Sequence, residues 1–218
     1  MTIKQEIESF KKDRIRGQAE RLFYERGFRG TSMDAIAESL HATKPFLYGA
    51  YQKKTDILFD IHLRVVQRSL DAIDTARASP GTPAEKLRRF ALRLTDVTLS
   101  NQAAVAIFFR EEASIPARQL RRINDLKGQI DDGIAALLAE GVAAGEFAIT
   151  DTRTAALAIG GMISWGYTWY RAAGRLDVAA IAEHMADYAL RIAGASAASS
   201  GPPGRKLRSR HAIQPETP

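Results

Sequence analysis

The sequence predicts an all-α protein. Apolar residues recur three and four positions apart along most of the chain, which is the spacing that gathers them on one face of a helix. Glycine, proline and short polar residues fall between these periodic segments, where helices begin and end. No segment shows a convincing strand pattern. We therefore expect about nine helices, arranged as an N-terminal three-helix domain with a helix-turn-helix and a C-terminal domain of antiparallel helices.

The first helix is expected from about Ser9 to Arg26, after polar residues 1–7 that we expect to be frayed. Its inward face consists of Ile15, Ala19, Leu22 and Phe23. Gly27 follows as a C-terminal cap. Lys12 and Arg16 on the charged face are candidates for phosphate contacts, although such a face is more often simply solvated.

Residues 31–54 are expected to form two short helices joined by a tight turn. Ser32 is the N-cap candidate of the first helix, whose apolar face consists of Met33, Ile36, Ala37 and Leu40. Thr43 can cap the second helix, in whose first turn Pro45 loses no hydrogen bond. An apolar inner side and a basic outer side are typical of a helix-turn-helix whose second helix enters the major groove of DNA. Two packed surface helices of an ordinary bundle would show the same periodicity.

The remaining segments also read as helices. A long helix is expected at 54–77, followed by a linker at 79–83, SPGTP, which is the best boundary within the chain. Periodic segments then follow at 87–97, 101–109, 116–144, 152–172 and 178–192, with Gly145 and Gly174 as breaks.

Charge and composition narrow the class of protein. The net charge is +6, and residues 9–54 carry ten Lys and Arg against five Asp and Glu. This asymmetry is expected when one domain meets phosphate, although two solvated basic segments would also produce it. There is no cysteine, no secretory pattern and no apolar run long enough to span a bilayer. We expect a soluble, cytoplasmic protein that does not contact a membrane.

Residues 8–58 resemble the DNA-binding domain of the TetR family of transcriptional repressors. The matching residues are Ala19-Glu20-Arg21-Leu22-Phe23, Gly27-Phe28, Thr31-Ser32-Met33, Ile36-Ala37, Thr43-Lys44, Leu47-Tyr48, Tyr51 and Lys54. Gly49-Ala50 departs from the family, which more often has two large residues there, so no known operator sequence is carried over. The resemblance implies a homodimer that binds a palindromic operator and is released from it by a ligand in the C-terminal domain. It implies a DNA-binding domain at 1–54, a ligand-binding and dimerisation domain at 55–195, and a tail at 196–218 whose composition predicts disorder.

Nine residues are candidates for contact with DNA: Thr31, Ser32, Thr43, Lys44, Pro45, Phe46, Tyr48, Gly49 and Lys54. Thr31 and Ser32, at a helix start, suit a phosphate, and Tyr48 suits another. Lys54 matches the family's phosphate-contacting lysine. Lys44, Pro45, Phe46 and Gly49 are expected to govern base preference, with Phe46 against thymine methyl groups.

Aromatic residues suggest a ligand pocket, although such residues usually belong to the hydrophobic core. The candidates are Phe108, Phe109, Glu112, Met162, Trp165, Trp169, Tyr170 and Arg171. The segments FFREEASIP and GGMISWGYTWYRAAGRL are similar to TetR-family regulators of fatty-acid, sterol and aromatic catabolism, which implies an acyl-CoA thioester or another small apolar effector. Basic residues are available for its phosphates at Arg121, Arg122, Lys127, Arg171 and Arg175.

The prediction of a dimer rests on the last two helices. Ala156, Gly160, Ser164 and Thr168 are four apart, and a small-residue side permits close helix approach, while the last helix adds an apolar stripe. Both stripes would look the same if they faced the protomer's own core.

Two other function classes compete with this interpretation. An enzyme is disfavoured because the four histidines are scattered and no nucleophile, phosphate-loop or metal-ligand motif is found, so we expect no cofactor and no metal. A helical protein-interaction module without specific DNA binding is the main alternative. Selective retention of DNA would separate it from a regulator.

Overall fold

The computed structural model describes residues 2–195, and these form ten α-helices and one short 3-10 helix with no strand. The first four are α1 (Ile3–Arg26), α2 (Met33–Ser39), α3 (Lys44–Tyr48) and α4 (Lys54–Ala78). The others are α5 (Pro83–Ser100), α6 (Gln102–Glu111), η1 (Glu112–Ser114), α7 (Ala117–Ala143), α8 (Thr152–Ser164), α9 (Gly166–Trp169) and α10 (Val178–Ile192). Only Trp165 separates α8 from α9, so joining them gives the nine helices expected from the sequence. The all-α fold prediction is confirmed.

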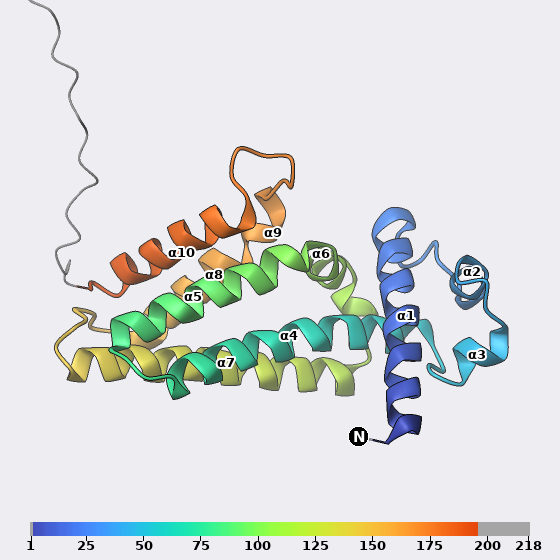
Figure 1. Ribbon diagram of the computed structural model, residues 1–218, viewed down its shortest axis with the longest axis horizontal. Coiled ribbons are helices and arrows are strands. Elements are labelled where there is room, and N and C mark those ends of the chain that lie inside the picture. The colour runs from blue at the N-terminus through green and yellow to red at the C-terminus, as the bar shows by residue number, and fades with distance from the viewer. Residues whose placement is uncertain (1, 196–218) are drawn as a thin grey trace, which may run out of the picture.

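Helices α1, α2 and α3 form a unit at one end of the molecule, with α1 standing across the end of the long helices and α2 and α3 on its outer side (Figure 1). The predicted inward residues of α1 are all buried, as are Ile36 and Leu47 from the two short helices. Thr31 stabilises this unit, because its buried hydroxyl donates to the carbonyl oxygens of Leu22 and Gly27. All three helices therefore bury apolar residues in this unit, and these residues belong to one apolar cluster that continues into the rest of the described protein.

The turn between α2 and α3 requires an unusual backbone conformation. His41 has φ of 51° and is the one non-glycine residue with positive φ in the described part of the chain. Its N–H donates to the carbonyl of Glu38 at 2.9 Å, and the next N–H, of Ala42, donates to Ala37 at 3.0 Å. The left-handed conformation reverses the chain so that α3 crosses α2.

Helix α4 is shared by the two parts of the molecule. Its first turns pack on α1, where Asp60 accepts hydrogen bonds from Arg16, at 2.9 Å, and from the hydroxyl of Tyr51. Burial, followed by the bond to Asp60, raises the pKa of Tyr51, so the phenol remains a donor. The later turns of α4 pack against α5 and α7. One continuous helix therefore runs from the helix-turn-helix into the bundle (Figure 1).

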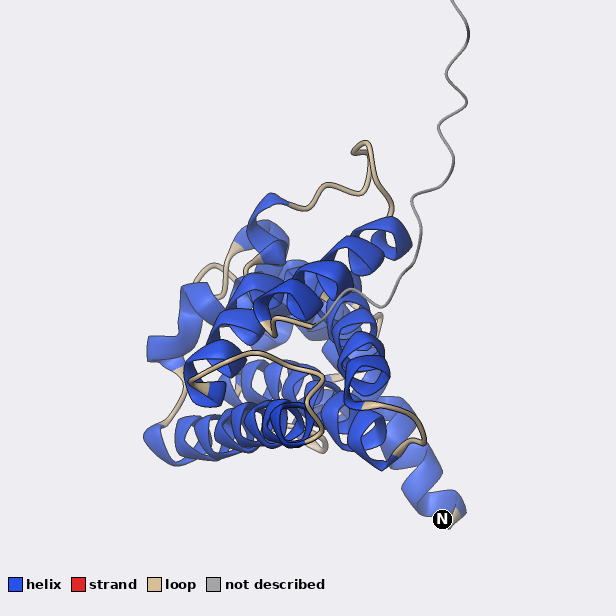
Figure 2. Cartoon of the chain, turned by 90° about the vertical axis from the view of Figure 1, so that its left-hand side faces the viewer, coloured by secondary structure: helices blue, strands red, loops and turns tan. Residues whose placement is uncertain are grey.

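Helices α4 to α10 form an antiparallel bundle around an apolar core (Figure 2). Gly145 has φ of 73° and ends α7 as expected, and the 79–83 segment is a tight turn between the packed helices α4 and α5. The apolar stripe of α10 packs on α5 within the same protomer, with Ile181 and Met185 buried. Among the described residues no helix has the length and apolar character needed to cross a membrane.

Two local expectations are wrong. Helix α1 begins at Ile3 rather than near Ser9, because Thr2 and Gln5 form a reciprocal capping box that satisfies the first N–H groups. The helix expected at 152–172 ends at Ser164 and, after one residue, continues only to Trp169. The prediction for 196–218 lies outside the described residues, and the proposed domain boundaries stay predictions.

The turn at His41 yields a test of stability. His41→Val should lower the free energy of unfolding by about 1–2 kcal/mol, because a β-branched residue is strained at positive φ, whereas His41→Gly should leave it unchanged or raise it. Chemical denaturation of the three proteins measures both values. Equal stability of the valine and glycine variants would contradict the assigned turn.

Candidate DNA interface and ligand cavity

Helix α3 presents a short polar surface to solvent. Thr43 caps it by accepting from the N–H of Phe46, and Pro45 lies in the first turn, where its missing N–H has no cost. Leu47 is fully buried and holds the helix on the core, while the next residue, Tyr48, is 41% exposed. Thr43, Lys44, Pro45 and Gly49 are also exposed. The exposed residues of α3 are thus the ones that the sequence assigned to DNA.

Lys44 links the two short helices. Its ammonium group lies 2.7 Å from the Asp34 carboxylate of α2, and that hydrogen bond raises the pKa of Lys44. Ser32 caps α2 by accepting from the N–H of Ala35 at 3.0 Å. Lys44 is fully exposed, so a phosphate or a base can replace the carboxylate as its partner.

Lys11 of α1 lies beside α3, which the sequence did not indicate. Its Nζ is 4.7 Å from the centre of the Phe46 ring. A Cβ atom at Gly49 would lie 3.0 Å from the same Nζ, so the absence of a side chain at Gly49 lets Lys11 approach. The departure of Gly49 from the family pattern thus accommodates a basic residue from another helix.

Three expected phosphate ligands have internal partners instead. Arg16 is held by Asp13 and Asp60, and only 11% of its side chain is exposed. The Lys54 ammonium donates to the carbonyls of Phe28 and Thr31, at 2.8 and 2.9 Å, and lies over the Phe28 ring. Thr31 itself is buried. These residues hold α4 against the helix-turn-helix, and their contact with DNA stays a prediction.

A cavity of about 310 Å³ lies among α4, α5, α6, α7 and α8. Its walls are mostly apolar, and the lining residues are His62, Val65, Val66, Ser69, Leu94, Thr98, Val105, Phe109, Lys127, Ile130, Asp131, Leu157, Gly160, Gly161 and Ser164. This size is at the lower end of the range for small-molecule sites.

The polar groups of the cavity gather on α4 and α7. His62 is buried, and its ring stacks on Phe108 with centroids 3.4 Å apart. Burial, with a smaller contribution from Lys127, lowers the pKa of His62 to about 2, so its imidazole is neutral. Burial also lowers the pKa of Lys127 and raises that of Asp131. The cavity wall therefore contains a neutral ring, whose two nitrogens are buried without a hydrogen-bond partner among the described residues, and one partly desolvated cation.

The predicted ligand residues do not form one site. Phe109 lines the cavity, and Phe108 lies beneath His62. Glu112 is near enough to oppose the lowered pKa of Lys127. Met162 is half-buried, whereas Trp169, Tyr170 and Arg171 line a second hollow between α9 and α10, and Trp165 is 61% exposed.

Sequence reasoning missed His62 and Asp131 as cavity residues. A histidine in the apolar stripe of 54–77 was the available signal. How deeply that histidine is buried depends on packing between helices that are distant in the sequence.

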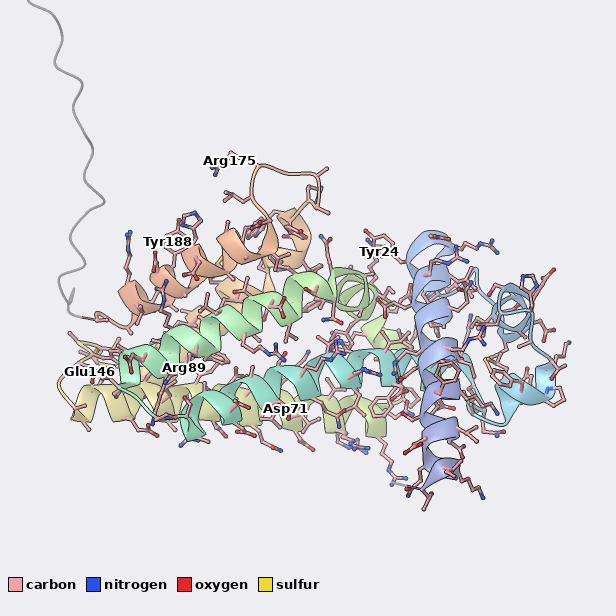
Figure 3. All side chains as sticks on the ribbon, in the orientation of Figure 1. Tyr24, Asp71, Arg89, Glu146, Arg175 and Tyr188 are labelled. Atoms are coloured by element: carbon pink, nitrogen blue, oxygen red, sulfur yellow. The ribbon has the colours of Figure 1, made fainter. Side chains whose placement is uncertain are left out.

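The small-residue stripe of α8 faces inward. Ala156 is buried, and Gly160 and Ser164 line the cavity, so the expected contact face for a second copy is wrong. Exposed apolar side chains lie instead at Leu157 and Trp165, at Trp169 in α9 and at Tyr188 in α10. Figure 3 shows Tyr188 on the outer side of α10, away from α5.

Comparison with protein families gives two matches. A model described as the tetracyclin repressor-like C-terminal domain matches residues 80–193, and one for bacterial regulatory proteins of the tetR family matches residues 15–61. None of the curated proteins compared with the chain matches it.

Several solved structures are similar along most of their length. A TetR/AcrR-family regulator from Thermobifida fusca YX-ER1 is 30% identical, with 82% of this chain and 96% of that chain covered and a TM-score of 0.69. A tetR-family regulatory protein from Rhodococcus RHA1 is 25% identical, with 85% and 98% covered and a TM-score of 0.78. AibR, in complex with isovaleryl coenzyme A and operator DNA, shares the fold at 24% identity, with 85% and 100% covered and a TM-score of 0.71.

Phe46→Ala should alter the preference among DNA sequences, because an apolar ring at the groove distinguishes thymine methyl groups. In specific complexes, a wrong base pair costs about 1–3 kcal/mol of binding free energy. We expect the variant to lose part of that difference between the preferred and the substituted base pair. Competition binding with single-base operator variants measures it, and a thermal melt establishes that the variant is folded. Equal weakening for every sequence would remove Phe46 from base readout.

Lys11→Ala should weaken binding to all DNA sequences alike and reduce the slope of log affinity against log salt by about 1, as expected for one lost phosphate contact. Lys86→Ala in α5 removes the same charge far from α3 and should leave the slope unchanged. Fluorescence anisotropy over a range of salt concentrations measures both. An unchanged slope for Lys11→Ala would place Lys11 away from the DNA.

Proposed function

This chain belongs to the TetR family of bacterial regulatory proteins, and on that premise we propose that it is a repressor released from its operator when a small molecule fills the cavity. As a member of that family it is a DNA-binding transcriptional regulator. The observation that carries the proposal is the exposed, capped helix α3, with Lys44 and Lys11 beside it, on a unit connected to the cavity through α4. A protein-interaction module would not need this arrangement.

Recognition of DNA begins with the basic groups around α3. Lys44 and Lys11 attract the phosphate backbone, and the exposed N-terminal turn of α3 enters the major groove. Phe46 and Tyr48 then lie at its walls, and the absence of a side chain at Gly49 allows close approach. Phosphate contacts fix the orientation, while Phe46 and Lys44 select the sequence.

We propose a homodimer that binds a palindromic operator. Two copies of α3 read successive half-sites only if a second protomer holds them about one helical turn of DNA apart. Leu157 of α8, Trp165 after it, Trp169 of α9 and Tyr188 of α10 are large exposed apolar residues and are our candidates for contact with the second protomer. In Figure 1, α10 lies along the upper side of the bundle, whereas α1, α2 and α3 lie at its right-hand end.

Ligand control acts through two helices that line the cavity and also contact α1. Helix α4 contributes His62, Val65, Val66 and Ser69 to the cavity, and α6 contributes Val105 and Phe109. At the far side of α6, the Arg110 guanidinium lies 5.5 Å from the centre of the Tyr24 ring in α1. A ligand that displaces α4 or α6 therefore shifts α1 and the spacing of the two recognition helices.

The effector is a small apolar molecule, and an acyl-CoA thioester is the second candidate. The fold shared with AibR, which was solved with isovaleryl coenzyme A, favours the thioester. Exposed Arg121, Arg122, Arg171 and Arg175 are available for its phosphates, and Figure 3 shows Arg175 on the loop beyond α9. The protein works in the cytoplasm, where its operator lies, and catalyses no reaction.

Sequencing the genomic fragments that the purified protein retains, together with sedimentation of the protein alone, tests this function. We expect a dimer that enriches a palindromic sequence at moderate ionic strength. A monomer without selective retention would favour the protein-interaction module.

Asp60→Ala tests the connection between α1 and α4. It removes the partner of both Arg16 and Tyr51 and should lower the free energy of unfolding by about 1–3 kcal/mol. This range already allows for solvent screening of the partly exposed Arg16–Asp60 pair. It should also weaken operator binding. Asp74→Ala, an exposed position on the same helix, is the control for both thermal unfolding and anisotropy. Equal behaviour of the two variants would contradict the connection.

A further inference from the structure

We propose that Asp34 and Lys44 together recognise one G·C base pair in each half-site of the operator, with the Lys44 ammonium on guanine and the Asp34 carboxylate on cytosine. This inference rests on the proposed function and deepens it, because it adds a residue of α2 to the base contacts of α3 and names the base pair.

The two side chains come from the starts of two helices. Asp34 lies in the first turn of α2, and Lys44 is the first residue of α3. The Lys44 Nζ lies 2.7 Å from Asp34 Oδ2, so this ion pair joins the N-terminal ends of the two helices. Residues at the start of a recognition helix are the ones that contact base edges in the major groove. A carboxylate held against Lys44 therefore reaches the same part of the groove.

Stability gives little reason for this ion pair. Both side chains are more than half exposed, and ion pairs with that exposure contribute little to the free energy of unfolding. Ile36 of α2 and Leu47 of α3 are fully buried and already hold the two helices on the core. What the ion pair determines is the pattern of charge on the surface that meets DNA.

The carboxylate restricts what this surface can bind. DNA phosphates repel Asp34, whereas hydrogen-bond donors attract it. On the base edges of the major groove, the donors are the N4 amino group of cytosine and the N6 amino group of adenine. Lys44 has three N–H bonds, so it can keep its bond to Asp34 while it donates to an acceptor on a base. The ion pair is therefore complementary to an acceptor that lies beside a donor.

A G·C base pair presents these groups at the right separation. Guanine O6 and cytosine N4 are hydrogen-bonded to each other, about 2.9 Å apart. This separation is close to the 2.7 Å between the Lys44 and Asp34 atoms. On the guanine side Lys44 meets two acceptors, O6 and N7, and on the cytosine side Asp34 meets a donor.

The other base pairs satisfy the two charges less well. Reversal to C·G places the amino group of cytosine against the ammonium and O6 of guanine against the carboxylate. With adenine on the Lys44 side, the donor N6 meets the ammonium. With thymine on that side, Lys44 meets one acceptor, O4, beside a methyl group. The ion pair should therefore discriminate most strongly between G·C and its reversal.

The neighbouring charges do not compete for this role. Lys44 is the one charged residue of α3. Glu38, the other acidic residue of α2, forms no ion pair among the described residues. Lys11, the basic group that approaches from α1, lies over the Phe46 ring instead. The contact between Asp34 and Lys44 is thus the place where an acid meets the recognition helix.

Competition binding tests the proposal with the full chain and the operator that it enriches from genomic fragments. Each position of the half-site is changed in turn to the other three base pairs, and a duplex of random sequence reports non-specific binding. We expect one position in each half-site at which G·C is preferred over C·G by about fivefold or more.

Three variants assign this preference. Asp34→Asn keeps the shape, but its amide can donate as well as accept, so the preference at that position should fall by about threefold or more, while affinity for random DNA should rise because a negative charge is removed. Lys44→Met should abolish the preference at the same position and weaken binding to random DNA. Asp74→Asn, an exposed position of α4, should behave as the original protein. Thermal melts establish that each variant is folded.

The double variant with both Asp34→Asn and Lys44→Met separates a joint role from two independent ones. It should lose no more of the G·C preference than Lys44→Met alone, because the two groups act as one unit. A purely structural role of Asp34 at the start of α2 would change thermal stability without changing the preference at any position.

Four results would each overturn the inference: no position with a G·C preference in the original protein, an unchanged preference in Asp34→Asn, effects of the two single variants at different positions, or equal strengthening of every DNA sequence by Asp34→Asn. Selective DNA retention by the original protein would still support the proposed function in all four cases. Absence of selective retention would instead remove the proposed function, and this inference with it.

Discussion

The structure depends on one constraint, which is that α4 packs both against α1 and against the helices of the bundle. Its first turns are bonded to the helix-turn-helix through Lys54 and Asp60, and its middle turns line the cavity with His62, Val65 and Val66. An uninterrupted helix moves as a rigid element over this length. We propose that a displacement of α4 at the cavity is transmitted to the carbonyls of Phe28 and Thr31 and to α1.

The polar groups of the two regions follow from this arrangement. In the DNA-binding unit, Arg16, Lys54 and Thr31 have internal partners and fix geometry, while we propose Lys11 and Lys44 for contact with DNA. In the cavity, His62 and Lys127 have aromatic neighbours rather than ionic ones.

The fold and the helix-turn-helix were predictable because their signals are local. Ser32 and Thr43 cap the helices that they were expected to cap, and the predicted inward residues of α1 are the buried ones. The sites were less predictable because they depend on contacts between distant segments. Lys11 reaches Phe46 from another helix, and the cavity brings His62 beside Lys127. The inward direction of the α8 stripe likewise depended on packing against α7. Small residues allow close packing against a helix of the same protomer or of a second copy, so the sequence does not distinguish the two.

Hydrogen exchange of the dimer with and without its selected operator tests the central role of α4 most directly. Coupling is reciprocal, so DNA bound at α3 must alter the cavity that a ligand would alter. We expect slower amide exchange in residues 54–61 and also in the cavity-lining residues 62–69 of the same helix. A change that stops at the helix-turn-helix, with exchange in 62–69 unaffected by DNA, would contradict the account.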